Sequence, residues 1–210
     1  MIEHKISKRP LEYEDTLKLM EKRVEKIISG NKPELLWFLE HEHIYTAGTS
    51  AKNSDLINAG DTPVVKTGRG GMHTYHGPGQ RVAYVMLDLK KRYDEPDIKE
   101  YVRSLEEWII RTLAHLKIKG ERRKDRIGIW IIDKSGNEEK IAAIGIRVRK
   151  WVTYHGIALN VSPDLNYFDG IIPCGIKGYG VTSLKKLGVS INMSELDNLL
   201  EKEFEVIFGK

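Results

Sequence analysis

The order of helical and extended segments most constrains the fold of this chain. Apolar residues recur at helical spacing in three places, at about residues 10–29, 97–120 and from Asn192 onward. Short apolar runs between these segments are typical of strands: Glu34–Glu40, Pro63–Thr67, Arg81–Leu89, Gly128–Ile132, Lys140–Arg149 and Trp151–Val161. Helices that bracket and interrupt a strand-rich middle predict an α+β fold with a mixed or antiparallel sheet.

Residues at the segment ends support these boundaries. Gly30 follows the first helical pattern as a stop signal, and Gly120 follows the second. Asp97 and Asn192 are each followed three residues later by a glutamate, Glu100 and Glu195. This capping-box pattern is typical of the start of a helix.

Length and composition indicate one compact unit. The 210 residues are 40% hydrophobic, with no linker, repeat or low-complexity segment, so we expect a single domain over residues 1–210. The 34 basic and 30 acidic residues give a net charge of +4, which favours acidic partners without requiring nucleic acid.

The chain has one cysteine, Cys174, which lies between Pro173 and Gly175. One thiol excludes an internal disulfide, and the first residues carry no apolar signal sequence, so we expect a cytoplasmic protein without a membrane segment. Flanking proline and glycine predict irregular backbone, where catalytic groups are often held. Taken alone, however, a lone cysteine is more often a small buried apolar residue.

A glycine-rich segment, Arg69–Gln80, contains four glycines together with Arg69, His73 and His76. Glycines let backbone N–H groups approach a ligand closely, although a structural hairpin loop is the alternative. The spacing of a phosphate-binding P-loop is absent. The histidines lack paired cysteines or a metal-binding spacing, so we expect imidazoles that orient substrate or backbone and no metal.

Two further segments carry candidate binding features. Lys140 begins the run Lys140–Gly145, whose small residues leave space along a strand, although such a lysine is commonly a solvated strand-edge charge. Trp151–Val161 passes from aromatic residues to a small-residue centre and is otherwise an ordinary core strand.

Together these motifs closely resemble the octanoyltransferase family, also called lipoate-protein ligase B, over roughly residues 34–187. The resemblance lies in Arg69–Gln80, Lys140–Gly145, Tyr154–Asn160, Pro173–Gly175 and the following Gly180–Leu184. It implies a fold similar to the biotin and lipoate ligases, with a mixed central sheet, a smaller sheet and flanking helices. It implies no cofactor, no metal and a monomer.

The resemblance also implies roles for individual residues. Cys174 corresponds to the acyl-thioester nucleophile, and Lys140 to the residue that lowers the pKa of its thiol. The implied substrate-binding residues are Arg69, Gly70, Gly71, Met72, His73, Thr74, Tyr75, His76, Ala143, Ile144, Gly145, Gly156, Ile157 and Ala158. Met72 and His73 fill positions that vary in the family, so His73 carries no weight.

The implied activity is transfer of octanoyl from acyl carrier protein to a lysine of lipoyl domains, the first step of endogenous protein lipoylation. The acceptors are lipoyl domains of 2-oxoacid dehydrogenase complexes or the glycine cleavage H protein. Because a thiolate is the attacking species and a free cysteine has a pKa of about 8.5, an ammonium beside Cys174 would favour the reactive form.

The same chemistry suggests further groups. We expect backbone N–H groups near Gly145 and Gly175 to stabilise the oxyanion. We expect the small residues Ala143, Gly156 and Ala158 to leave an apolar slot, in which about six methylenes contribute roughly 5 kcal/mol.

Two basic clusters suggest an acidic protein partner, although a solvated surface is the alternative. They comprise Lys117, Lys119, Arg122, Arg123, Lys124 and Arg126, and then Arg147, Arg149 and Lys150.

Three other functions stay open from the residues alone. An ATP-dependent lipoate or biotin ligase would use a lysine like Lys140 but no nucleophilic Cys174. A non-catalytic acyl-binding or carrier-docking module would keep the glycine segment without turnover. A transferase that moves octanoyl between lipoyl domains would differ only in its donor.

Overall fold

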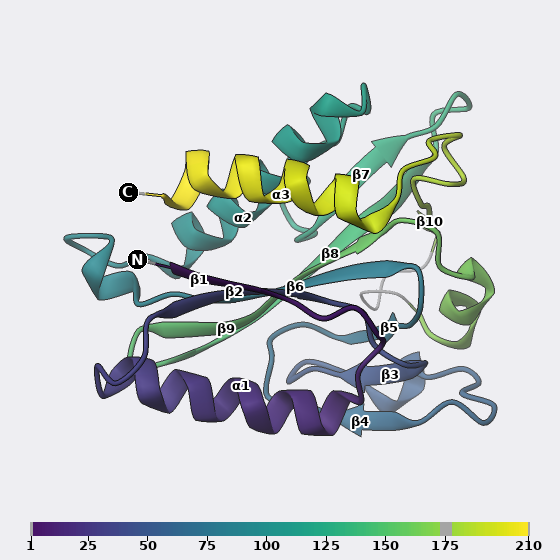
Figure 1. The fold of residues 1–210 in the computed structure, drawn as a ribbon. Helices are drawn as coiled ribbons and strands as arrows, with labels where there is room; N and C mark the ends of the chain where they lie inside the picture. The colour runs from purple at the N-terminus through teal and green to yellow at the C-terminus, as the bar shows by residue number, and fades with distance from the viewer. Residues whose placement is uncertain (1, 173–177, 210) are drawn as a thin grey trace.

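The computed structural model describes residues 2–172 and 178–209, and a large twisted sheet forms its centre (Figure 1). Within these residues the sheet has seven strands in the order β1-β2-β6-β9-β8-β10, with β7 pairing to β8. The strands are β1 Ile2–Ile6, β2 Glu34–Leu39, β6 Gln80–Met86, β7 Ile129–Ile132, β8 Glu138–Arg149, β9 Val152–Asn160 and β10 Gly180–Val181. β1 runs parallel to β2 and β10 parallel to β8, whereas the other pairs are antiparallel. The predicted mixed sheet is therefore confirmed.

A smaller sheet lies beside the large one and contains β3 Ile44–Ala47, β4 Val64–Lys66 and β5 His73–His76. β3 pairs in parallel with β4 and antiparallel with β5. The glycine-rich segment Arg69–Gln80 is not one continuous loop between strands, because β5 interrupts it. Its four residues are too short and polar to reveal a strand, and their partner β3 lies about 30 residues earlier in the chain.

Three long helices cover the two faces of the large sheet (Figure 1). α1 Tyr13–Ile28 covers one face, and α2 Ile98–His115 and α3 Met193–Phe208 pack together over the other. In the part of the chain that the structure describes, three short 3₁₀ helices lie in the connections: η1 Asn53–Asp55, η2 Leu89–Lys91 and η3 Leu165–Gly170. The three helices predicted from periodicity, and the α+β fold, are confirmed.

Each helix buries its apolar stripe against the sheet. Met20, Val24 and Ile27 of α1 belong to one core cluster, whereas Trp108 of α2 and Phe204 of α3 belong to the cluster on the opposite face. The side-chain burial of such residues stabilises the fold by roughly 2 kcal/mol each.

The helix starts agree with the predicted caps. The carboxylate of Asp97 accepts a hydrogen bond from the backbone N–H of Lys99, and Asn192 and Glu195 form a reciprocal capping box at α3. The hairpin between β8 and β9 turns at Lys150 and Trp151, which both have positive φ (50° and 68°), as a two-residue type I′ turn requires.

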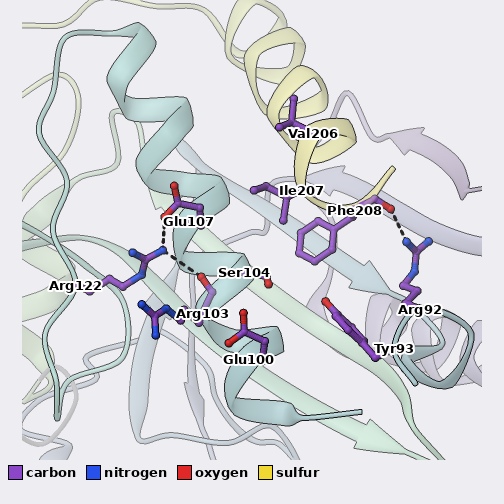
Figure 2. Close-up of a pocket in the computed structure, with 10 residues that line it drawn as sticks. All are labelled: Arg92, Tyr93, Glu100, Arg103, Ser104, Glu107, Arg122, Val206, Ile207 and Phe208. Carbon is purple, nitrogen blue, oxygen red and sulfur yellow. Dashed lines mark hydrogen bonds and ion pairs between the residues drawn. The ribbon is translucent and has the colours of Figure 1, made fainter. Parts of the chain in front are cut away.

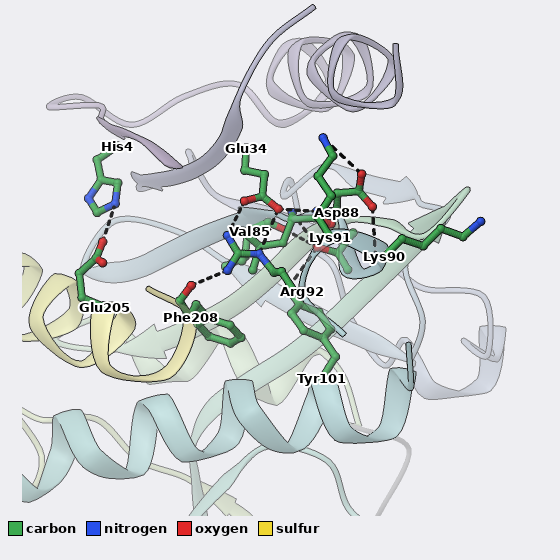
Figure 3. A network of polar contacts seen from close by, with 12 residues as sticks. His4, Glu34, Val85, Asp88, Lys90, Lys91, Arg92, Tyr101, Glu205 and Phe208 are labelled. Carbon is green, nitrogen blue, oxygen red and sulfur yellow. Dashed lines mark hydrogen bonds and ion pairs between the residues drawn. The ribbon is translucent and has the colours of Figure 1, made fainter. Parts of the chain in front are cut away.

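A polar network joins one end of the large sheet to the C-terminal end of α3 (Figure 3). The guanidinium of Arg92 donates to the carboxylate of Glu34 and to the carbonyl oxygen of Phe208. Asp88 caps η2 by accepting from the backbone N–H of Lys90. β2, η2 and α3 are therefore tied together by charge-assisted hydrogen bonds in addition to the apolar core.

In the described part of the chain, no helix is both long enough and apolar enough to span a bilayer.

Candidate active site

A cavity of about 500 Å³ opens between β8, β9 and the segment that enters the smaller sheet. Of the residues predicted to bind substrate, it is lined by Arg69, Gly70, Gly71, Met72, His73, Thr74, His76, Ala143, Ile144, Gly145, Gly156, Ile157 and Ala158. Lys140 lies in the same wall. Three segments separated by up to about 90 residues thus converge on one cavity, although their roles in binding stay predictions.

Tyr75 is the predicted binding residue that does not line this cavity. Its ring is fully buried and stacks on Tyr167 at 4.7 Å between centroids, and its hydroxyl hydrogen-bonds to Nδ1 of His43 at 2.7 Å. Alternation along β5 turns Tyr75 away from the neighbouring side chain of Thr74. Tyr75 therefore packs the smaller sheet onto η3.

Lys140 lies in the interior of the large sheet, because β8 has β7 and β10 on its two edges at this point. The side chain is buried, and its Nζ donates a hydrogen bond of 3.0 Å to the carbonyl oxygen of Ile127. The ring of Trp130 lies 4.7 Å from Nζ, a cation–π distance. The alternative of a solvated strand-edge lysine is therefore wrong.

Gly128 makes this position of Lys140 possible. A Cβ at Gly128 would lie 3.2 Å from Cε of Lys140 and 2.6 Å from the carbonyl oxygen of Ala142, and its φ of 123° favours glycine.

Arg69 holds the glycine-rich segment against both sheets. Its guanidinium donates to the carbonyl oxygen and hydroxyl of Thr46 at 2.8 and 2.7 Å, and to the carbonyl oxygen of Met72 at 3.0 Å. The backbone N–H of Gly70 donates to the carbonyl oxygen of Ile146 in β8. Arg69 and Gly70 thereby form the cavity wall that faces β8.

Close neighbours leave no room for a side chain at Gly145 and Gly156. A Cβ at Gly145 would meet the side chain of Arg69 at 3.2 Å, and one at Gly156 would meet the carbonyl oxygen of Ala83 at 2.2 Å. The expectation that Gly156 simply leaves room for an acyl chain therefore misses its main constraint, which is the neighbouring strand β6.

The hydrogen bonds of two buried histidines fix their tautomers. Nδ1 of His41 faces the carbonyl oxygen of Leu11 at 2.8 Å and must donate, so its Nε2 accepts from the hydroxyl of Tyr84 at 2.7 Å. Nδ1 of His76 likewise donates to Oε1 of Gln80 at 2.6 Å. Both are neutral, because burial lowers the pKa of His41 to about 4 and that of His76 to about 3.

His73 lies in β5 and lines the cavity near Lys140. Burial lowers its pKa, although Asp55 opposes the shift. Among residues 2–172 and 178–209, no group of three or more His, Cys, Asp or Glu side chains is arranged to hold a metal ion.

Cys174 and Gly175, predicted as the nucleophile and as one oxyanion donor, lie outside the described residues. On one side of them, the backbone N–H of Ile172 donates to the carbonyl oxygen of Asp55 at 2.7 Å. On the other, Val181 pairs with Lys140 in the sheet. The chain therefore re-enters the sheet beside Lys140 seven residues after Cys174.

Several cavity residues were not predicted from sequence: Tyr13, Ser50, Val82, Tyr84, Ile98, Val102, Asp125, Arg126, Ile127, Ile146 and His155. Tyr13 begins α1 and His155 precedes Gly156, yet the sequence around each of them indicates only an ordinary aromatic residue and no binding site. Their role depends on how distant elements pack.

The arginines of the two basic clusters are largely paired within the chain. Arg122 pairs with Glu107, Arg123 with Glu121 at 2.9 Å, Arg126 with Glu138, Arg147 with Glu21 at 3.8 Å and Arg149 with Glu25 at 3.0 Å. Lys117, Lys124 and Lys150 remain exposed. These pairs reduce the positive field that the sequence predicts for an acidic partner.

A second cavity, of about 570 Å³, lies between α2, η2 and the end of α3 (Figure 2). It is lined by Arg92, Tyr93, Glu100, Arg103, Ser104, Glu107, Arg122, Val206, Ile207 and Phe208. Arg122, within it, is held by Glu107 and by the carbonyl oxygen of Arg103. Because its described lining includes none of the predicted site residues, we place the candidate active site in the cavity beside Lys140.

The fold is that of the lipoate protein ligases. A lipoate protein ligase from Thermoplasma acidophilum superposes with a TM-score of 0.74 at 17% identity, covering 100% of this chain and 84% of that one. A lipoate-protein ligase A bound with ATP gives a TM-score of 0.73 at 17% identity, covering 99% and 86%.

Residues 12–205 match the model of the lipoyl protein ligase A/B catalytic domain, and the chain belongs to this family. A protein from Paramagnetospirillum magneticum named octanoyltransferase is 56% identical, covering 99% of this chain and 97% of its own. An octanoyltransferase from the Wolbachia of Brugia malayi is 55% identical, covering 99% and 100%. The family resemblance predicted from the motifs is confirmed.

Proposed function

We propose that this protein transfers an octanoyl group from acyl carrier protein to a lysine of lipoyl domains, through a thioester on Cys174. The observation that carries the proposal is the cavity in which buried Lys140 meets the three motif segments. The octanoyltransferase relatives, 55–56% identical over nearly the whole chain, support the same reaction.

The proposed chemistry has two acyl transfers. The Cys174 thiolate attacks the donor's thioester carbon, and the carrier's thiolate leaves and takes up a proton. The amine of the target lysine then attacks the Cys174 thioester, forms the amide, loses a proton and releases the cysteine thiolate. Lys140, held by Ile127 and Trp130, is the candidate for both proton transfers.

We further propose that residues 1–210 act as a single catalytic domain, as a monomer in the cytoplasm. Acyl carrier protein is the proposed donor, and lipoyl domains of 2-oxoacid dehydrogenases or the glycine cleavage H protein are the proposed acceptors. The acidic surfaces expected on these partners suit the exposed lysines that remain beside the paired arginines.

Intact-mass measurement tests the proposal. Incubation with octanoyl-acyl carrier protein should add the mass of one octanoyl group to the chain, and a lipoyl domain should remove it. Cys174→Ser and Cys174→Ala should abolish the thioester adduct. An unchanged wild-type mass would favour a non-catalytic binding module, and lipoylation by Cys174→Ala with ATP and free lipoate would favour a ligase.

A further inference from the structure

Glu106 is an acid on the buried face of α2. It is 7% exposed, and its neighbours Leu105 and Trp108 on the same face belong to the hydrophobic core. A glutamate is rarely buried to this extent unless its carboxylate is paired and hydrogen-bonded, because burial of an unpaired charge is costly. The groups around this carboxylate therefore indicate what the acid contributes at a position that an apolar residue would fill.

The carboxylate of Glu106 contacts a backbone amide and a guanidinium. Oε1 accepts a hydrogen bond of 3.3 Å from the N–H of Gly128, and Oε2 lies 3.3 Å from Nε of Arg122. Arg122 also pairs with Glu107, whose side chain is 39% exposed, against 10% for Glu106 (Figure 2). The arginine is thus shared by two carboxylates, and the contact with Gly128 distinguishes Glu106 from its neighbour.

The peptide group between Ile127 and Gly128 connects Glu106 to Lys140. Its N–H donates to Glu106, and its carbonyl oxygen accepts the 3.0 Å hydrogen bond from Nζ of Lys140. The N–H and C=O of a trans peptide point in opposite directions, so the carboxylate and the amine lie at its two ends. This peptide precedes β7, which begins at Ile129, and the two side chains provide the hydrogen bonds that a strand ladder would otherwise give.

The two charges match the dipole of this peptide. The carboxylate faces the positive N–H end and the ammonium faces the negative carbonyl end, so each hydrogen bond polarises the peptide and strengthens the other. The carboxylate oxygen and Nζ are at most about 8.5 Å apart, because the N and O atoms of a peptide are about 2.2 Å apart. Solvent screens buried charges at such a distance far less than exposed ones, so the carboxylate stabilises the ammonium form.

Other ionisable groups surround Glu106 and Lys140. They are Arg103 and Arg122 beside the carboxylate, His73 and Asp125 in the walls of the cavities that Lys140 lines, and Arg126 and Tyr179 against the ring of Trp130. Burial raises the pKa of Glu106, whereas the hydrogen bond from Gly128 and the nearby cations oppose the shift. Burial lowers the pKa of His73, so this histidine is neutral above pH 7 and does not change its charge there.

We propose that Glu106 is a positioning residue for Lys140: through the Ile127–Gly128 peptide, its carboxylate fixes the direction of the amine and favours the protonated form. The inference rests on the proposed function. There, the Lys140 ammonium stabilises the Cys174 thiolate and gives a proton to the departing carrier thiolate, and the resulting amine regains a proton from the attacking lysine of the acceptor. Glu106 is not among the described residues that line the cavity, so it acts through Lys140. Without its charge, the Lys140 ammonium should lose its proton at lower pH.

Glu106→Gln tests the role of the charge, because glutamine keeps an acceptor for the Gly128 N–H at the same length. Single-turnover adduct formation with octanoyl-acyl carrier protein is followed by intact mass between pH 7 and pH 10. The alkaline limb of the pH–rate profile should move down by about one pH unit in Glu106→Gln. The matched control is Glu107→Gln, which removes a carboxylate from the same Arg122 and should keep the wild-type profile. An unchanged limb in Glu106→Gln, or an equal shift in both variants, would overturn the inference.

A second measurement does not require Glu106→Gln to fold. In the wild-type chain, the ¹³C resonance of the Glu106 carboxyl carbon should show an inflection above pH 7, where Lys140 loses its proton, and Lys140→Met should lack it. A wild-type resonance without this inflection, or the same inflection in Lys140→Met, contradicts the link between the two residues. If the wild type forms no adduct with octanoyl-acyl carrier protein, the proposed function fails, whereas the carboxyl titration still tests the effect of Glu106 on Lys140.

Discussion

Nζ of Lys140 donates a 3.0 Å hydrogen bond to the carbonyl oxygen of Ile127, so the buried amine is held in one orientation. The ring of Trp130 covers it from another side. A fixed amine at the wall of the cavity is suited to repeated proton transfer, because it is already positioned before each step.

Replacement of Lys140 should therefore reduce the rate of acyl transfer more than it reduces the stability of the fold. We expect Lys140→Ala and Lys140→Arg each to reduce adduct formation by about 10²-fold or more, since arginine keeps the charge but does not release a proton. Single-turnover rates followed by intact mass provide the measurement. The matched control is Lys134→Ala, an exposed lysine in the β7–β8 turn, which should retain the wild-type rate. A Lys140→Arg rate within a few fold of wild type would contradict proton transfer by this residue.

The packing of β6 against β9 gives a second prediction. Gly156→Ala places a methyl group 2.2 Å from the carbonyl oxygen of Ala83, a backbone atom that cannot rotate away. We expect a loss of about 2 kcal/mol in the free energy of unfolding, measured by urea denaturation. Gly70→Ala is the control, because its nearest contact is an ordinary 3.5 Å. Similar unfolding midpoints for both variants would show that β6 and β9 can separate to accept the methyl group.

The sequence predicts the elements of this fold whose signal is local. The helices α1, α2 and α3 have long apolar periods, α2 and α3 have clear caps, and β2, β4, β6, β7, β8 and β9 overlap the predicted short apolar runs. Strands β1, β3, β5 and β10 were missed, because each has only two to five residues and depends on a partner strand for its pairing. A short strand is stabilised by its partner, which local composition does not reveal.

The candidate site divides in the same way. Motifs indicate Arg69, Lys140 and the Ala143 and Gly156 segments, and the structure brings all of them to one cavity. The burial of Lys140 depends on β7 and β10 pairing on both sides of β8, which a lysine in isolation does not indicate. His155 has a positive φ of 60° within β9, and its ring contacts that of Tyr84; neither feature is visible in the sequence pattern.

The buried histidines predict a pronounced loss of stability in acid. Burial lowers the pKa values of His41, His76 and His155 to about 4, 3 and 3, below the ordinary 6.5. As the pH falls below 6.5, the unfolded chain takes up protons that the folded chain does not, so folding stability decreases down to pH 4 or 3. Each such histidine lowers the free energy of unfolding by up to about 1.4 kcal/mol per pH unit, or about 4 kcal/mol per pH unit for the three together.

Urea denaturation at pH 7.5, 6.5 and 5.5 measures this dependence. His76→Asn removes one titrating group, so its free energy of unfolding should vary less steeply between pH 6.5 and 5.5 than that of wild type, even if the variant is less stable overall. A variant with the wild-type slope would show that His76 takes up a proton in the folded chain over the same pH range as in the unfolded chain.

The ion pair between Arg81 of β6 and Asp197 of α3 predicts the opposite pH trend. The pair is buried, with Nε and Oδ1 2.9 Å apart, and burial raises the pKa of Asp197 to about 6 although Arg81 opposes the shift. Because the folded carboxyl takes up a proton between about pH 6 and its ordinary 3.8, acid relieves the penalty of burying its charge. Arg81→Met should therefore cost about 3 kcal/mol at pH 7.5, where it leaves an unpaired buried carboxylate, and distinctly less at pH 5.

A double-mutant cycle with Asp197→Asn isolates this pair from the histidines, whose acid effect is shared by all four chains. The asparagine of Asp197→Asn carries no charge, so loss of Arg81 leaves no unpaired buried carboxylate in that background. Arg81→Met should therefore reduce the free energy of unfolding less than it does in wild type at pH 7.5, and this reduction should vary little with pH. If the cost of Arg81→Met in the wild-type background is the same at pH 7.5 and pH 5, Asp197 does not take up a proton in this range and stays ionised beside Arg81 at both pH values.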